Sequence, residues 1–600
     1  MGFRRALAEI AAAATATTFV PAQAATTRAP NPAVNPVGWI TVAHPPGRRP
    51  VFVDQRGREV LLRGANVVGI EDDYYDGATT KPTDTTPQWP VDPAAYAGSC
   101  PAMNHRSAEP PICEVDAGGP EFAQSAAANS RNDLAQLRAL GMNVMRLTLS
   151  WSELEPTPGA YSTAYLDRIA QVVGWAAQQN VRVLLDMHQD NYSRYTPGTA
   201  PLDASPLAGP TPPSANHADG APPWAVITDG EPAIALAGQA PFNAYVAASF
   251  DSFWHNRIPT GAPTGAAPGP GLQDHYIGAL AALGKRFAAN PTVVGYEIMN
   301  EPLSGTAPPV MFSTAELFPF YRRVIDALTG ARDGLPCPTG LPPNPACGYP
   351  DLGVHVRHQS FFFEPMVLRD VTDGPDQVPS RFSSYPNLVY APHVYTHEFT
   401  ADAIVGIPPG QSPYPTSYDQ AYTVADREAR VFGAALWVGE FGNSARDDPT
   451  ILAGTTAAAD RALTGNAIWD WKSQCGAGTT PADCLNAWSV YAGDPSPKPA
   501  QNGPLVPSRV LYLSRPYPML TAGRLDALGY DPARRRFTMA ATASRARRGA
   551  DTVIWLPPSM AGNVTVTGAA VLSSLNVQPD GSRLVVVAPT RRGPYLVTAS

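Results

Sequence analysis

The sequence predicts an α/β protein in which a (β/α)8 TIM barrel is followed by a C-terminal antiparallel β-sandwich domain. Three observations lead to this prediction. Short apolar runs alternate with segments of helical periodicity from Ala65 to Trp469. Polar residues collect just after the ends of these runs, where barrels of this kind carry their active sites. Beyond about residue 505 the helical spacing gives way to short alternating strands separated by turn residues.

The predicted barrel strands are near-continuous apolar runs, as expected for parallel strands that are covered on both faces. They begin at Ala65, Asn143, Val181, Val293, Phe361, Leu388, Ala435 and Asn466. A β-hairpin is predicted over 51–64, before the first barrel strand. Ser162 is placed to cap the helix that ends near Asn180, and Ser313 with Glu316 forms a capping box for a helix closed by Gly330.

The chain divides into four predicted parts: a signal peptide at 1–24, an extended Pro-rich segment at 25–48, the barrel with long loop insertions at 49–504, and the β-sandwich at 505–600. Arg4 and Arg5 precede an Ala/Thr-rich stretch, and Ala22-Gln23-Ala24 is a small-residue cleavage site. A disordered tail is the alternative. The signal predicts a secreted protein, extracellular or in the cell envelope. No other stretch approaches 18 apolar residues, so no transmembrane span is expected.

Charge and cysteine content exclude some classes of protein. A net charge of −8 and a pI near 5.7, without a basic stripe, argue against nucleic-acid binding. Six cysteines allow 15 pairings, but close spacing in Gly/Pro-rich loops favours three disulfides. These are Cys100–Cys113, Cys337–Cys347 and Cys475–Cys484. Metal-type C-x-x-C spacing is absent, and with no nucleotide motif either we expect neither a metal nor a cofactor.

Two glutamates stand at the ends of apolar runs. Glu301 follows Asn300 and precedes Pro302, and Glu440 ends the run that begins at Ala435. As ordinary turn residues, Asn and Pro would need no functional explanation. However, unpaired carboxylates do not suit a strand core, and cleavage of a glycosidic bond requires two carboxylates, one to protonate the leaving oxygen and one to attack the anomeric carbon. The pair therefore predicts a glycosidase.

From Val51 to the C-terminus the chain resembles a family-five glycoside hydrolase (clan A) of the endoglycoceramidase type. The resemblance is carried by Leu-Asp-Met-His-Gln-Asp at 185–190, Gly-Tyr-Glu-Ile-Met-Asn-Glu-Pro at 295–302, Pro-His-Val-Tyr at 392–395, Val-Gly-Glu-Phe-Gly at 438–442 and Arg-Pro-Tyr-Pro at 515–518. The first and last of these stretches carry most of the resemblance to the subgroup.

The resemblance implies a retaining mechanism with Glu301 as acid/base and Glu440 as nucleophile. It implies that Arg146 hydrogen-bonds the nucleophile and that Asn300 binds the sugar 2-hydroxyl. Arg146 would fit a structural ion pair equally well, and Asn300 retains its alternative as a turn residue. Tyr395 is expected to orient Glu440.

Other residues are expected to line the sugar subsite. His188 and His393 match family histidines there, and Trp469 matches the aromatic floor under the ring, with a barrel-core tryptophan as the alternative. Asp190 is expected to accept from sugar hydroxyls, or else to be an N-cap or loop residue. Two further carboxylates, Glu297 and Glu364, are interpreted as supporting or rim groups.

The sequence thus predicts an exported retaining endo-β-glycosidase that cuts between glycan and ceramide in glycosphingolipids. Its substrate would be a glycolipid or oligosaccharide, with possible peripheral contact to a lipid surface. Loops at 71–120 and 194–240, with the residues just before the second, carry aromatic side chains that would form an apolar trough for lipid tails; these are Tyr74, Tyr75, Tyr192, Tyr195 and Trp224.

Two alternatives remain open at this point. One is another specificity on the same scaffold: a steryl glucoside, another aglycone or a β-glucan. The other is a non-catalytic glycan- or glycolipid-binding protein. A Ser-His-Asp esterase is disfavoured because no G-x-S-x-G motif occurs.

Overall fold

A computed structural model describes residues 38–70, 131–193, 220–230, 244–259, 269–331, 333–335, 348–375, 380–406, 414–472, 488–491, 505–544 and 550–600. Residues 37–600 form one compact unit. The predicted signal peptide, all six cysteines and most of the two long loops lie outside the described residues, so the disulfide and export predictions stay predictions.

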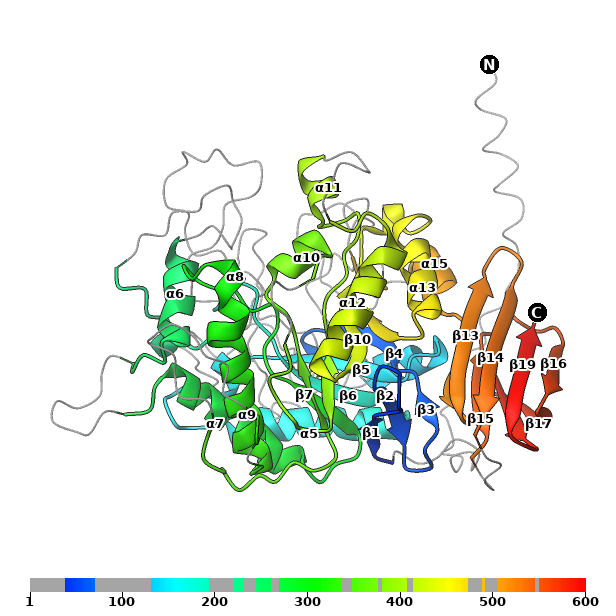
Figure 1. The fold of residues 1–600 in the computed structure, drawn as a ribbon, viewed down its shortest axis with the longest axis horizontal. Helices are drawn as coiled ribbons and strands as arrows, with labels where there is room; N and C mark the ends of the chain where they lie inside the picture. Colours follow the sequence, from blue (N-terminus) through cyan, green and yellow to red (C-terminus); the bar gives the residue numbers. More distant parts are fainter. Residues whose placement is uncertain are drawn as a thin grey trace, which may run out of the picture. The chain divides into compact units, whose positions relative to one another are not determined.

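Eight parallel strands form a closed barrel in the order β10-β11-β4-β5-β6-β7-β8-β9 (Figure 1). Their bounds are β4 (Arg63–Val67), β5 (Val144–Leu149), β6 (Arg182–Met187), β7 (Val293–Glu297), β8 (Ser360–Phe363), β9 (Leu388–Tyr390), β10 (Ala435–Phe441) and β11 (Gly465–Ile468). The ring closes where β4 pairs with both β5 and β11. The predicted barrel and the eight runs that build it are confirmed.

Helices follow the strands and cover the barrel from outside (Figure 1). The described helices are α4 (Trp151–Leu154), α5 (Thr163–Gln178), η3 (Pro223–Ala225), α6 (Ala244–Trp254), α7 (Leu272–Phe287), α8 (Pro309–Phe312), η5 (Ser313–Leu317), α9 (Phe318–Thr329), α10 (Leu368–Thr372), α11 (Ala401–Val405), α12 (Tyr418–Phe432), η6 (Ala445–Asp447), α13 (Ile451–Arg461) and α15 (Pro507–Leu513). Their apolar faces and the outward side chains of the strands form the main hydrophobic core.

One predicted helix start is confirmed and one is wrong. The side chain of Ser162 accepts a hydrogen bond from the backbone N–H of Tyr165, as a helix cap does. Ser313 does not cap a helix, because the chain is already helical from Pro309 and continues through a single wide turn. Proline is well suited to a first helical turn, and it precedes the capping-box pattern. Gly330 ends the helix in the left-handed conformation, as predicted.

An antiparallel hairpin of β1 (Ile40–Ala43) and β2 (Val51–Asp54) lies at the N-terminal ends of the barrel strands. Ile40, Val42 and Phe52 pack in one buried cluster with side chains of every barrel strand except β4. The rings of Phe52 and Phe362 stack with centroids 6.0 Å apart. The hairpin therefore closes the barrel at the end opposite the polar strand ends.

The C-terminal region contains antiparallel sheets, as predicted. A four-stranded sheet, orange to red in Figure 1, has the order β13-β14-β19-β16, with β13 (Arg524–Asp531), β14 (Arg536–Ala543), β16 (Val564–Gly568) and β19 (Gly593–Ala599). A seven-stranded sheet joins β1, β2 and β3 (Glu59–Val60) to β12 (Tyr517–Thr521), β15 (Thr552–Leu556), β18 (Arg583–Pro589) and β17 (Ala570–Val577). The pairing of Val60 with Leu520 joins the two ends of the described chain.

Contacts between this region and the barrel are tight. The hydroxyl of Tyr517 donates to the backbone carbonyl of Gly141 at 2.6 Å. Gly141 has φ +86°, and a Cβ at this position would lie 2.6 Å from the ring of Trp555. Arg515 and Arg63 both pair with the carboxylate of Asp460. A search of the described residues for an apolar helix of membrane-spanning length finds none.

Candidate active site

The predicted site residues meet at the C-terminal end of the barrel. They come from different strands or from the segments directly after them, because each apolar run ends where its chain leaves the barrel. Arg146 lies in β5, His188 and Asp190 follow β6, Asn300 and Glu301 follow β7, His393 and Tyr395 follow β9, Glu440 lies in β10, and Trp469 follows β11.

Glu440 is held by two donors. Nη1 of Arg146 donates to Oε1 of Glu440 at 2.6 Å, and the hydroxyl of Tyr395 donates to Oε2 at 2.7 Å. Each carboxylate oxygen thus has a short hydrogen bond, and the carboxylate plane is fixed. A cation and a hydroxyl on the two oxygens stabilise the ionised form of the group.

The guanidinium of Arg146 lies fully buried among acceptors. Its partners are Glu297 Oε2 at 2.6 Å, Asn66 Oδ1 at 2.8 Å, Glu440 Oε1 at 2.6 Å, Asn300 Oδ1 at 2.8 Å, Glu364 Oε1 at 3.1 Å and Asp186 Oδ2 at 3.1 Å. Burial lowers the pKa of Arg146, but the surrounding carboxylates together raise it well above its ordinary value. This cation neutralises part of a strongly acidic cluster.

Glu301 occupies an unusual backbone conformation. Its φ is +39°, in the left-handed region that costs a non-glycine residue free energy. Hydrogen bonds hold the segment from both sides. The backbone N–H of Glu301 donates to Oε2 of Glu364 at 3.0 Å, and Nε2 of Gln189 donates to the carbonyls of Asn300 and Glu301 at 2.7 and 3.0 Å. The strained turn therefore presents one side chain in a fixed direction.

His393 links the two glutamates. Its Nδ1 lies 2.7 Å from Oε1 of Glu301 and 3.6 Å from Oε2 of Glu440. Because both distances start at one atom, the nearest carboxylate oxygens are no farther apart than their sum. A separation of this order is compatible with the roughly 5–5.5 Å between the carboxyl groups of retaining glycosidases.

The electrostatics assign different protonation states to neighbouring groups. Burial raises the pKa of Glu301, and Glu440 raises it further, while the hydrogen bond from His393 lowers it; the net shift is upward. Burial lowers the pKa of His393, but Glu364 and Glu440 raise it well above its ordinary value. A protonated His393 therefore donates to Glu301 and leaves the other oxygen of Glu301 to carry a proton.

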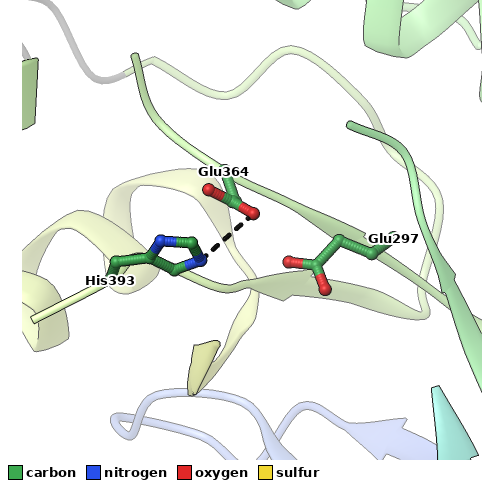
Figure 2. A group of neighbouring side chains, drawn as sticks. All are labelled: Glu297, Glu364 and His393. Carbon is green, nitrogen blue, oxygen red and sulfur yellow. Dashed lines mark ion pairs between the residues drawn. The ribbon is translucent and has the colours of Figure 1, made fainter. Parts of the chain in front are cut away.

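Glu364 and Glu297 are buried supporting carboxylates, so a place at the rim is excluded. Figure 2 shows the Glu364 carboxylate pointing at the His393 ring, with its Oε1 3.3 Å from Nε2. Burial raises the pKa of Glu364, but His393 and Arg146 bring it below its ordinary value. These three side chains of Figure 2 lie close enough to hold a metal ion. Arg146 forms an ion pair with each of the two carboxylates, so ion pairing accounts for the arrangement.

His188, Trp469 and Asp190 form another group of side chains at the site. The rings of His188 and Trp469 stack with centroids 5.2 Å apart and 12° between their planes. Trp469 is partly exposed, which argues against the alternative of a barrel-core tryptophan. Nδ1 of His188 bonds Asp186 at 2.8 Å, and its Nε2 lies 3.5 Å from the half-exposed Asp190. This arrangement offers an aromatic face beside polar groups, as a sugar ring requires.

Sequence reasoning missed several members of the site. Asn66 in β4 accepts from Arg146 and donates to the carbonyl of Gly439, beside the Glu440 backbone. Gln189 lies in the stretch 185–190, of which only His188 and Asp190 were predicted as site residues. Asp370 in α10 is buried 4.0 Å from Nδ1 of His393. Gln189 directly follows a predicted strand and had that signal. Asn66 is a polar residue inside the predicted first strand, and Asp370 stands in a helix and had no signal.

The five aromatic residues of the predicted trough differ in where they lie. Tyr74, Tyr75 and Tyr195 lie outside the described residues. Tyr192 is buried, and its hydroxyl donates to the carbonyl of Ala225, so the expectation that it lines an open trough is wrong. Its ring fills the core because it packs against Phe250. Trp224 is only partly buried and donates to the carbonyl of Glu155.

An aromatic group that was not predicted lies next to Tyr395, the hydrogen-bond partner of Glu440. The rings of Phe399 and Trp488 stack with centroids 5.0 Å apart and 18° between their planes. Tyr395, which binds Glu440, contacts both rings. Phe399 is 46% exposed. An exposed aromatic stack in contact with a Glu440 partner offers an apolar surface beside the carboxylate pair.

Comparison with known families places this geometry in a wider context. The model of the cellulase family (glycosyl hydrolase family 5) matches residues 114–474. The model of the glycoside hydrolase family 5 C-terminal domain matches residues 515–594. The two matches cover the barrel from the long first loop onward and most of the C-terminal sheets.

Individual relatives point the same way. The chain is 25% identical over 468 residues to endoglycoceramidase I of Rhodococcus hoagii (strain 103S), which covers 76% of this chain and 77% of that protein. A crystal structure of endogalactoceramidase matches with 25% identity and a TM-score of 0.64, over 94% of this chain and 100% of that one. The lactosyl-enzyme intermediate of endo-glycoceramidase II from Rhodococcus sp. shares the fold, with 22% identity, a TM-score of 0.60, and coverage of 92% and 99%.

Proposed function

The chain belongs to glycosyl hydrolase family 5, and on that premise we propose that it is a retaining endo-β-glycosidase that hydrolyses the bond between glycan and ceramide in glycosphingolipids. One observation carries the proposal: Glu301 and Glu440 approach the same nitrogen atom of His393, at 2.7 and 3.6 Å. Two carboxylates this close fit direct attack by one of them rather than attack by an intervening water.

In the proposed first step Glu301 gives its proton to the glycosidic oxygen while Glu440 attacks the anomeric carbon. The bond to the ceramide oxygen breaks, ceramide leaves as the alcohol, and the glycan remains on Glu440 as an ester. In the second step Glu301, now ionised, takes a proton from water, which attacks the same carbon and releases the glycan with retained configuration.

The surrounding groups fit these roles. Arg146 and Tyr395 each donate to one oxygen of Glu440 and so hold its carboxylate in place for attack. Formation of the ester removes the charge of Glu440, which is one of the groups that raise the pKa of Glu301. The pKa of Glu301 therefore falls between the two steps, which suits a change from acid to base.

Sugar binding is proposed for four residues, namely His188, Trp469, Asp190 and Asn300. Trp469 would stack under the ring, and His188 and Asp190 would bond its hydroxyls. Nδ2 of Asn300 donates to the carbonyl of Gln189 at 2.9 Å, which leaves its second hydrogen for the 2-hydroxyl. If Asp190 were only an N-cap or loop residue and Asn300 only a turn residue, as in the alternatives above, neither would serve as a polar partner of the sugar.

The ceramide specificity has two supports. Two relatives that are 25% identical to this chain and share most of their length with it carry the names endoglycoceramidase I and endogalactoceramidase. The stacked rings of Phe399 and Trp488 provide an apolar surface beside the catalytic pair, where a lipid aglycone can bury its chains. Family membership in the hydrolases and the intact glutamate pair disfavour a non-catalytic binding protein.

Digestion of a substrate panel tests the specificity. Purified protein is incubated with lactosylceramide, a steryl glucoside and cellopentaose, each in detergent micelles, and the products are separated by thin-layer chromatography. Release of intact lactose and ceramide, absent with Glu440→Gln, is expected. Preferential cleavage of the steryl glucoside or of cellopentaose would contradict the ceramide assignment while leaving the glycosidase assignment in place.

We also propose export through the signal at 1–24, supported by Arg4, Arg5 and the Ala22-Gln23-Ala24 site. N-terminal sequencing of protein recovered from the culture medium or cell envelope is expected to begin after Ala24. Full-length protein confined to the cytoplasm would contradict export.

A further inference from the structure

A second polar cavity lies at the N-terminal ends of the barrel strands, away from the catalytic carboxylates. Its volume is about 320 Å³, and its walls include Ala435 and Leu436 at the start of β10 and Gly465 at the start of β11. Glu440 stands near the opposite end of β10. The other walls come from residues 48–52 and 59–61, from Asp426 and Arg430 in α12, from residues 462–464 and from the segment around Leu525.

The cavity carries an excess of positive charge. Four arginines line it, namely Arg48, Arg49, Arg430 and Arg524, against three carboxylates, namely Glu59, Asp426 and Asp526. Arg48 pairs with Glu59 at 2.7 Å, and Arg524 pairs with Asp526. Asp426 serves two arginines at once, because Arg49 reaches its Oδ1 at 2.8 Å and Arg430 its Oδ2 at 2.6 Å. One guanidinium charge is therefore not balanced within the cavity.

Hydrogen-bond donors in the cavity also outnumber the acceptors. Both oxygens of each carboxylate already accept a bond: the second Glu59 oxygen from the Leu525 backbone, and the second Asp526 oxygen from Thr542. A guanidinium has five N–H donors and a carboxylate about four lone-pair sites, so the four arginines carry more donors than the three carboxylates can accept. Among the described residues, Nε of Arg49 is buried without a partner, and the whole side chain is only 8% exposed. A buried, unpaired donor of this kind is costly.

Mutual repulsion adds to the imbalance. Burial lowers the pKa of Arg49; Asp426 raises it, and the neighbouring charges of Arg430 and Arg48 lower it. An anion placed among these guanidiniums would relieve both the repulsion and the shortage of acceptors.

We propose that this cavity binds a small organic anion whose carboxylate or phosphate is held by Arg49 and Arg430. A bare inorganic ion would leave most of the volume unfilled, while apolar side chains such as Phe52, Leu436 and Leu525 line the rest. An acidic monosaccharide or a sugar phosphate combines the required charge with a body of suitable size. The site is separate from the catalytic pair and does not depend on the proposed reaction.

Isothermal titration calorimetry on the full-length protein tests the proposal. The probes are N-acetylneuraminic acid, glucose 6-phosphate, inorganic phosphate and, as the neutral sugar, lactose. Each is titrated into the wild-type protein, into Arg430→Ala and into Arg461→Ala. Arg461 is the matched control, because it is a similarly exposed arginine paired with Asp419 and does not line the cavity. Arg524→Ala gives a second variant at another wall.

We expect one of the two anionic sugars, N-acetylneuraminic acid or glucose 6-phosphate, to bind to the wild type and to Arg461→Ala with equal affinity. Binding should weaken about tenfold or more in Arg430→Ala, the effect of losing one charge-assisted hydrogen bond. It should survive an excess of lactose, which marks it as distinct from the catalytic site. Three results would overturn the proposal: no binding of either anionic sugar, binding of inorganic phosphate alone, or equal affinity in Arg430→Ala and Arg461→Ala.

Discussion

The backbone N–H of Glu301 donates a hydrogen bond to the carboxylate of Glu364 at 3.0 Å. This bond connects the left-handed turn after β7 to the residue that follows β8. Gln189, after β6, holds the same turn from its carbonyl side. Three neighbouring strand ends thus fix the position of one catalytic side chain, at a backbone conformation that the residue would not adopt without such support.

Loss of this support should reduce turnover more than binding. In Gln189→Met the side chain keeps its shape but loses both donors to the turn, so Glu301 is less well placed in the transition state. We expect kcat to fall by about 10- to 100-fold with little change in KM. Steady-state kinetics on a soluble aryl β-glycoside measure both constants.

Gln359→Met is the matched control for this variant. Gln359 is also buried, and its Nε2 donates to the backbone carbonyls of Phe287 and Asn290 at the other end of the barrel. This variant should lose stability but keep kcat. An equal loss of kcat in both variants would show that the effect comes from general loosening of the fold.

The sequence predicted the barrel because each strand signal is local. Runs such as Val293–Glu297 and Ala435–Phe441 are buried over their whole length, and this appears directly as a mostly apolar run that carries a glutamate at or near its end. The pairing of Val60 with Leu520 was not predictable in this way, because strand partners so far apart in the chain leave no local pattern. The sequence therefore indicated the hairpin at 51–64 but not the sheet that it joins.

The candidate site shows the same division. Glu301, Glu440, Arg146 and His393 were singled out at strand ends, and the structure brings them together. Glu364 was interpreted only as a supporting or rim carboxylate, and Gln189 was given no role. Their bonds to the Glu301 turn depend on a positive φ that no residue type announces. Tyr192 was misjudged because an aromatic residue beside a long loop looks the same in sequence whether its ring faces solvent or core.

Tyr395 should contribute to catalysis through its hydroxyl. Tyr395→Phe keeps the ring contacts with Phe399 and Trp488 but removes the donor to Glu440. Removal of one positioned donor from a charged group costs about 10²-fold in kcat in comparable sites. We expect a loss of this order, measured on the aryl β-glycoside.

Tyr595→Phe provides the comparison, since the hydroxyl of Tyr595 is also buried and bonded, to Thr552 in the C-terminal region. Full activity of Tyr595→Phe with reduced activity of Tyr395→Phe is the expected result. Unchanged kcat in Tyr395→Phe would remove Tyr395 from the catalytic account.

The pH dependence should follow Glu301. Glu301 must be protonated to act as the acid, so activity is present below its pKa and lost as pH rises through it. Burial and Glu440 raise this pKa, which places the alkaline limb of kcat/KM above the ordinary range for a glutamate. In Glu440→Gln the charge of residue 440 is gone, and the pKa of Glu301 should fall.

Infrared titration of the carboxyl band, with Glu301→Gln to assign it, measures this pKa in the variant. A band in Glu440→Gln that titrates at the wild-type pH would contradict the assigned coupling between the two glutamates.

The contact between barrel and C-terminal sheets should be sensitive at Gly141. In Gly141→Ala the new methyl group meets the ring of Trp555, and φ is +86°. Gly159→Ala has a similar φ of +75° but nothing within 4 Å of its Cβ. Both variants carry the backbone strain, so we expect Gly141→Ala to be less stable by a further 1–3 kcal/mol or so, the usual cost of overpacking. Thermal unfolding of the two variants compares them, and equal midpoints would contradict the tight contact.

Covalent labelling tests the assignment of the two glutamates most directly. In a 2-deoxy-2-fluoro-β-lactosyl fluoride the 2-fluorine slows both steps, while the anomeric fluoride is a good leaving group in the first. The glycosyl-enzyme should therefore accumulate and be visible as one added 2-deoxy-2-fluorolactosyl group in the intact mass. Peptide mapping by mass spectrometry should then place the label on Glu440. A label on any other residue, or turnover without a label and with inversion at the anomeric carbon, would contradict the account.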